Sequence, residues 1–171
     1  MIRSWGVVAL TGNAQPLVGD VTTAAFVVPA EGQLAKVQVA NSAKYQVGDR
    51  IILGAGSAGA NILLVSQIPS GGTTLLCESE GNAKLSAWPN GTIIMLDIVC
   101  AVVRFQVIAS AAIWFGSDNT VTNTGGGTAF EVLHTGGSDS IGQPQWNSIR
   151  SSELWMAGTL ADTIGVAVIV V

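Results

Sequence analysis

The stretch RIILGAGSAGANILLVSQIPSGGTTLLCESE, residues 50–80, decides how the fold is read. Gly54, Gly56 and Gly59 follow a strand-like run in the spacing G-x-G-x-x-G, and the acidic residue Glu78 follows further along. This is the outline of a dinucleotide-binding turn, in which glycines let the backbone approach a pyrophosphate and a later acid holds the ribose. Such a fold must continue with a helix whose N-terminus faces the phosphates.

The residues after the third glycine favour a strand instead. Ile62, Val65 and Ile68 are β-branched, Pro69 ends the run, and the segment ANILLVSQIPSGG has no charged residue for the solvated face of a helix. We therefore interpret the glycines as a loop between two strands, because glycine adopts positive φ at little steric cost. We expect no bound cofactor.

The same pattern of short apolar runs and turn residues continues along the whole chain. Turn signals such as TGN, VGD, PSGG, PNG and NTGGG recur about every ten residues, which is the spacing of an all-β protein. The sequence predicts an antiparallel β-sandwich or barrel, with one short helical turn near residues 147–154. Two small β modules are expected, residues 1–100 and residues 101–171, although a single larger sandwich is the alternative. Residues 1–15 form either an extended N-terminal arm or a first strand.

Charged residues are unusually few. They make up 11% of the 171 residues, against roughly 25% in ordinary soluble domains, while hydrophobic residues make up 49%. The apolar runs at residues 93–103 and 164–171 are shorter than the roughly 18 residues of a membrane-spanning helix, and we expect neither a membrane span nor a signal peptide. The composition therefore favours extensive contact with other protein subunits.

The net charge limits which kinds of partner we expect, and the cysteine pattern limits the disulfide and metal chemistry. The net charge is -4 and the seven basic residues are scattered, so we expect no nucleic-acid partner. Cys77 and Cys100 lie in apolar runs, which favours two buried free thiols, with one disulfide as the alternative. No Cys or His spacing predicts a metal.

Other chemistry-bearing residues favour structural roles. His134 precedes Ser138, Asp139 and Ser140, but the row G-G-S-D-S-I-G is not a nucleophile elbow. Glu78 and Glu80 are two residues apart on one strand face, without a sugar cleft in view. The loop at Asp118 does not have the oxygen-ligand spacing of a calcium site. We expect no enzyme activity and no metal.

The five tryptophans are many for a chain with one tyrosine. Aromatic side chains with a polar atom are common anchors of interfaces. We expect Trp5 and Trp146 to contact a partner and Trp114 and Trp155 to be either core or contact residues, and we add Arg3 to this expected interface.

Two segments carry a resemblance. KVQVANSAKYQVGDRIILG with NILLVSQIPSGGTTLLCE resembles a pattern of phage structural proteins, and AAIWFGSDNTVTNTGGGTAFEVLHTGG with SSELWMAGTLADTIGVAVIVV resembles the small β-sandwich of tailed-phage head decoration and fibre proteins. The resemblance covers residues 104–171 well and 36–98 loosely. Its motifs mark a scaffold, so no catalytic residue is carried over.

What the resemblance implies is a virion protein, made in the host cytoplasm, that forms a homotrimer. It would bind the outside of the capsid between major capsid subunits as a decoration, or cement, protein. Three other functions stay open: a tail, neck or fibre component, a carbohydrate-binding module that uses Trp146, and an enzyme with a flavin or nicotinamide at residues 54–59.

Overall fold

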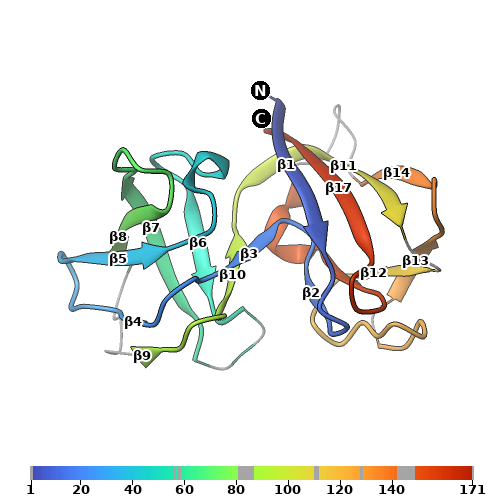
Figure 1. Ribbon diagram of the computed structural model, residues 1–171, viewed down its shortest axis with the longest axis horizontal. Helices are drawn as coiled ribbons and strands as arrows, with labels where there is room; N and C mark the ends of the chain where they lie inside the picture. Colours follow the sequence, from blue (N-terminus) through green and yellow to red (C-terminus); the bar gives the residue numbers. More distant parts are fainter. Residues whose placement is uncertain are drawn as a thin grey trace. The chain divides into compact units, whose positions relative to one another are not determined.

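The computed structural model describes residues 2–55, 57, 59–80, 87–109, 112–127, 129–141 and 149–170. The chain divides into two compact units, which are shown in Figure 1: unit 1 contains residues 1–18 and 98–171, and unit 2 contains residues 19–97. Both are built from antiparallel strands, and the regular helices in the described ranges are two single 3-10 turns. The all-β prediction is therefore confirmed.

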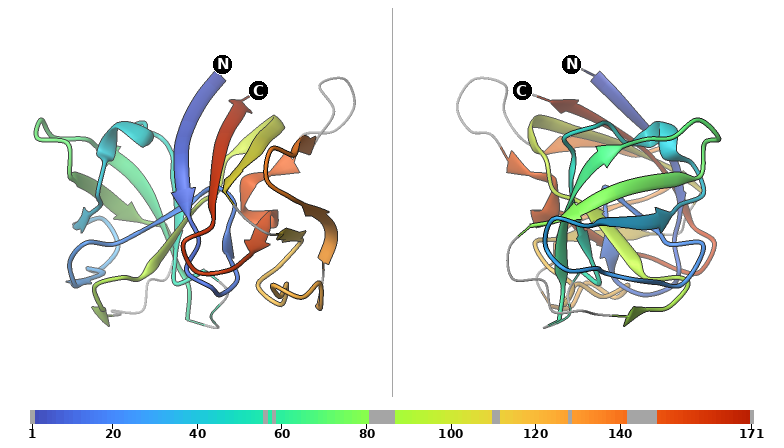
Figure 2. Two further views of the ribbon diagram at one scale, coloured as in Figure 1. Left: turned by 45° about the vertical axis from the view of Figure 1, so that its right-hand side comes forward. Right: turned by 90° about the vertical axis from the view of Figure 1, so that its left-hand side faces the viewer.

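The division differs from the expected one at the N-terminus. The boundary between residues 97 and 98 lies close to the predicted boundary after residue 100, but residues 1–18 belong with the C-terminal part of the chain. The reason is strand pairing: β1 (Ile2–Ala9) lies antiparallel to β17 (Thr163–Val170), as Figures 1 and 2 show. Residues 2–9 are thus a first strand and not an extended arm, and unit 2 is inserted into unit 1.

Unit 1 contains two sheets. The first has the order β1-β17-β11-β14, with β15 also paired to β11, and the second has the order β13-β12-β16-β2. The further elements are β2 (Gln15–Pro16), β11 (Val99–Ala109), β12 (Ile113–Gly116), β13 (Ala129–Leu133), β14 (Ser138–Ile141), β15 (Ile149–Arg150), η2 (Ser151–Glu153) and β16 (Trp155–Ala157). The turn η2 falls within the predicted helical segment 147–154.

The two sheets of unit 1 pack face to face. Phe105 of β11 stacks on Phe115 of β12, with ring centroids 4.4 Å apart and an interplanar angle of 29°. Residues alternate along each strand, so one face of β17 places Ile164, Val166 and Val168 in the core while the other face is turned outward. Unit 1 is therefore a β-sandwich, and the face of its first sheet opposite to the core is turned outward.

Unit 2 is built around one six-stranded sheet of order β3-β10-β6-β7-β8-β5. Its elements are β3 (Gly19–Val21), β4 (Phe26–Val27), β5 (Leu34–Gln38), η1 (Ser42–Lys44), β6 (Arg50–Leu53), β7 (Asn61–Gln67), β8 (Thr74–Ser79), β9 (Ala87–Trp88) and β10 (Ile93–Leu96). Just beyond β3 and β5, Thr22 bridges Val39 and the Thr23 N–H donates to the Gln38 carbonyl at 2.9 Å. The sheet therefore curls until its two edges meet, as in a small barrel.

Residues 50–67 contain β6 and β7 joined by the glycine loop, so the strand predicted after Gly59 is confirmed. Gly54 has φ +62, and a Cβ at this position would clash with the ring of Trp88. The Trp88 Nε1–H donates to Asn61 Oδ1 at 2.9 Å, which fixes the ring against the glycine. Gly54 is thus required for packing, and the next element in the described residues is strand β7, where a dinucleotide fold needs a helix. Gly56 lies outside the described residues.

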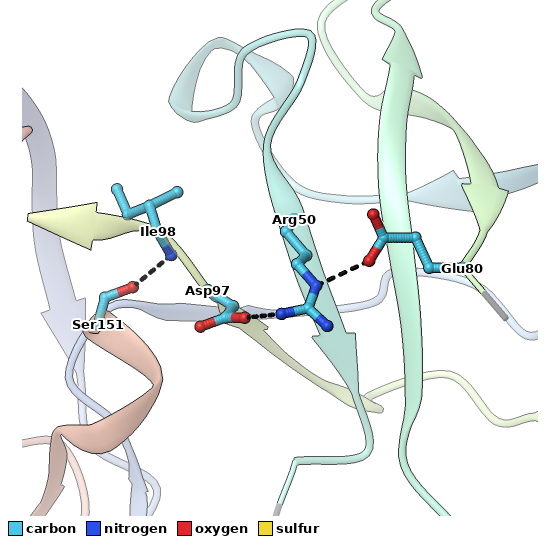
Figure 3. Close-up of polar contacts among 5 residues, drawn as sticks. All are labelled: Arg50, Glu80, Asp97, Ile98 and Ser151. Carbon is cyan, nitrogen blue, oxygen red and sulfur yellow. Dashed lines mark hydrogen bonds and ion pairs between the residues drawn. The ribbon is translucent and has the colours of Figure 1, made fainter.

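One ion-pair network joins the start of β6 to the residues that directly follow β8 and β10. Arg50 donates from Nε to Glu80 at 2.8 Å and from Nη1 to the buried carboxylate of Asp97 at 2.8 Å, as Figure 3 shows. The hydrogen bond that Arg50 donates to Glu80 holds the pKa of Arg50 above its ordinary value, with Asp97 adding in the same direction and burial opposing both. Glu80, considered above as part of a carboxylate pair, therefore stabilises the barrel.

The VGD turn, which is Val47, Gly48 and Asp49, precedes β6 and also has a structural role. Asp49 is buried, its Oδ2 accepts from the Gln46 N–H at 2.7 Å, and Gly48 has φ +93. The Gly48 N–H donates to the Val65 carbonyl, and the Val65 N–H donates to the Asp49 carbonyl, both at 2.8 Å. The motif fixes the register of β7 against the start of β6.

Candidate functional site

The outward face of the first sheet of unit 1 is the candidate site. Its residues stand in two rows that run across four neighbouring strands, in the order β1, β17, β11, β14. One row is Ser4, Ala167, Arg104 and Ser140, and the next is Val7, Gly165, Gln106 and Ser138. Side chains at alternate positions point to the same face, so all eight residues share the side opposite the core.

This face is hollowed into an open groove of about 670 Å³, which is lined by both rows together with Gly6, Phe105, Val166 and Asp139. Its floor is β17, where Gly165 has no side chain and Ala167 has only a methyl group. The strands on either side carry longer residues, Arg104 and Gln106 on β11 and Val7 on β1. Small residues between larger ones therefore give the groove its depth.

The groove is polar, and the charged side chain in its two rows is that of Arg104. Arg104 is exposed, and among the residues that the structure describes no carboxylate forms an ion pair with it. Asp139 pairs with the inward residue Phe105, so strand alternation places it outside the two rows, and its Oδ1 accepts the N–H of Ser140 at 2.6 Å. The remaining polar side chains are the hydroxyl groups of three serines and the amide of Gln106. Such a surface can donate several hydrogen bonds and one charge-assisted pair to a ligand.

The residues expected at an interface lie elsewhere. Trp5, Trp155 and Arg3 are 1%, 5% and 8% exposed, so they offer almost no surface to a partner. The contact role expected of Trp5 and Arg3 is thus corrected, because β1 is paired to β17 and both side chains are on its buried face. The burial of Trp155 agrees with the core alternative. Trp114 is half-buried, and its ring lies where a Cβ of Gly125 would come within 2.6 Å. Trp146 lies outside the described residues.

The other chemistry-bearing residues do not come together in a catalytic cluster. His134 is exposed, and its carbonyl accepts the Gly137 N–H at 2.8 Å in the turn before β14. Glu78 is exposed on β8. Asp118 Oδ1 accepts from the N–H and hydroxyl of Thr120, at 2.8 and 2.6 Å, and so closes its own loop. Within the described ranges, no three His, Cys, Asp or Glu residues gather as a possible metal site.

The groove residues were missed by sequence reasoning. Their signal is the alternation of R-x-Q on β11 and G-x-A on β17, where polar or small residues interrupt apolar ones at every second position. This pattern marks an outward face, but it does not tell which strands are neighbours.

Comparison with known proteins adds no relative: no protein-family model, no curated protein and no solved structure matches the chain. In the part of the chain that the structure describes, no helix has the length and apolar character needed to cross a membrane.

Proposed function

We propose that the protein is a structural protein of a tailed-phage virion, a decoration protein that binds the outer capsid surface between major capsid subunits and stabilises the shell. The observation that supports it best is the exposed apolar surface of a chain with so few charges. Large hydrophobic side chains are exposed on both units, among them Leu160 at 72%, Ile2 at 71% and Val47 at 65%. Apolar surface of this kind suits a protein that works while covered by other subunits.

The architecture suits this role. Antiparallel pairing satisfies the backbone hydrogen bonds of the inner strands, and side chains on the outward faces are available for contact. A decoration protein needs no reaction chemistry, since it stabilises the assembled shell by binding it in preference to free subunits. Self-association into a trimer would place several copies of each outward face at a junction between capsid subunits, and would increase avidity.

The test uses expanded shells of the encoding phage, produced without this protein. The purified full chain is first measured by light scattering, then mixed with shells and sedimented. We expect a trimer that sediments with the shells and raises the temperature at which they break. A protein that stays in the supernatant at all concentrations tested would contradict the decoration role. Detection on tails of complete virions would instead place it among the tail or fibre components.

A further inference from the structure

We infer that the groove on the outward face of β1-β17-β11-β14 binds an extended acidic segment of the shell protein, with a carboxylate of that segment paired to Arg104. This inference rests on the proposed function and names the surface that performs it. The floor is the first reason. Because Gly165 and Ala167 carry almost no side chain, a backbone can lie directly on the central strand of the face.

The charge in the groove is the second reason. In unit 2, Arg50 is paired with two carboxylates, whereas Arg104 has no ion-pair partner among the described residues. A guanidinium holds a carboxylate through two parallel hydrogen bonds, and the pair is stronger than a neutral one. Asp139 pairs with the inward residue Phe105, so its carboxylate does not stand in the row of Arg104.

The shape of the face indicates an extended segment. The floor follows β17 across both rows, between Val7 of β1 and the longer side chains of β11, so a segment that lies on it is extended and runs along the strand. Ser4, Ser140 and Ser138 provide hydrogen-bonding groups along these rows, and Val7, which is 62% exposed, provides an apolar contact at the β1 end. A sugar would need an aromatic platform, but the one aromatic residue of the lining, Phe105, is 3% exposed with its ring in the core.

The first experiment reverses the charge in the groove. Arg104→Glu and Lys36→Glu change the net charge equally, and Lys36 is an exposed residue of β5 in unit 2. We expect Arg104→Glu to weaken sedimentation with expanded shells at least tenfold, Arg104→Lys to weaken it severalfold, and Lys36→Glu to leave it unchanged. Far-UV circular dichroism and the melting temperature of each variant show whether it is folded. A folded Arg104→Glu protein that binds shells like wild type would overturn the inference and leave the decoration role standing.

The second experiment identifies what lies in the groove. Cys77 and Cys100 are buried, so a Gln106→Cys variant can be labelled at the groove alone with a maleimide photo-crosslinker. After irradiation on shells, we expect mass spectrometry to find a crosslinked shell-protein peptide that contains Asp or Glu. A crosslinked peptide without either residue, or a crosslink to a second copy of this chain, would overturn the inference. Wild-type protein that does not bind shells would overturn the proposed function and the inference together.

Discussion

Glycine is required in this chain for two separate reasons. One is a left-handed backbone conformation, and the other is a neighbouring group that occupies the place of a Cβ atom. Gly125 and Gly136 both have φ +82, but a Cβ at Gly125 would lie 2.6 Å from the ring of Trp114, whereas nothing lies within 4 Å of one at Gly136. These two turn glycines are therefore not equivalent.

This difference predicts the effect of two matched substitutions. Gly136→Ala should lower the free energy of unfolding by about 1–2 kcal/mol, because only the left-handed conformation is penalised. Gly125→Ala should cost about 1–3 kcal/mol more, since the ring of Trp114 must also move. Urea unfolding followed by tryptophan fluorescence measures both. Equal losses would show that contact with Trp114 contributes nothing.

The two cysteines are free and buried, Cys77 in unit 2 and Cys100 in unit 1, so the disulfide alternative is not what the structure has. Burial raises the pKa of the Cys77 thiol from 9.0 to about 12. Burial, with the negative charge of Glu153, raises that of Cys100 to about 11. Both thiols are thus held neutral in the folded protein at a pH where the unfolded chain ionises.

The resulting pH dependence has a definite sign. A raised folded-state pKa contributes stability that is fully present below about pH 9 and is lost as the pH rises toward 11 to 12, because the unfolded chain releases these protons first. Over that window, each thiol should lower the free energy of unfolding by up to about 1.4 kcal/mol per pH unit. Chemical unfolding of wild type and of the Cys77→Ala, Cys100→Ala double variant at several pH values measures the difference. Parallel curves would contradict the prediction.

At the scale of elements, β1 joins the N-terminal residues to the C-terminal strand β17. It is an edge strand whose inward residue Trp5 is fully buried and whose outward residue Val7 is exposed. A bulge between Ser4 and Gly6 shifts the register, so that Ser4 and Val7 still stand in the outward rows. The same strand therefore completes the core and one wall of the groove.

This double role predicts opposite results for neighbouring residues. Trp5→Ala should lower the free energy of unfolding by about 3–5 kcal/mol, because it leaves a large cavity in the core. Val7→Ala should change it by no more than about 0.5 kcal/mol. Thermal and chemical unfolding of both variants test this. If residues 1–15 were a free arm, Trp5→Ala would be as mild as Val7→Ala.

At the scale of the whole molecule, one unit interrupts the other. In unit 1, Ile98 and Ser151 exchange hydrogen bonds, with the Ile98 N–H donating to Ser151 Oγ at 3.1 Å (Figure 3). The Leu17 N–H donates to the carbonyl of Leu154 at 2.9 Å. Both points where the chain leaves and re-enters unit 1 are therefore held by the short segment around η2. In unit 2, Gly19 pairs with Met95, so its ends also meet.

Because the chain ends of each unit lie close together, we expect each unit to fold without the other. Residues 19–97 expressed alone should give a dispersed amide NMR spectrum and a cooperative melting transition. Residues 1–18 joined to 98–171 by a short Gly-Ser linker should do the same. Collapse of either piece into a disordered spectrum would show that the two units fold only together.

The sequence by itself determined the local structure of this protein. Alternation of apolar residues and the turn residues between them are read over a few positions, because side chains of a strand alternate between two faces and glycine permits positive φ. This was sufficient to predict strands, to recognise β7 after Gly59 where a dinucleotide fold needs a helix, and to predict two β modules.

The tertiary structure decided everything that depends on which distant strands pair. The pairing of β1 with β17 moved Trp5 and Arg3 from an expected interface into the interior, and it made unit 2 an insertion. It also brought Ser4, Ala167, Arg104 and Ser140 into one row. No local pattern encodes such partners, because many strands of similar apolar character can pair, and the choice depends on the free energy of the whole core.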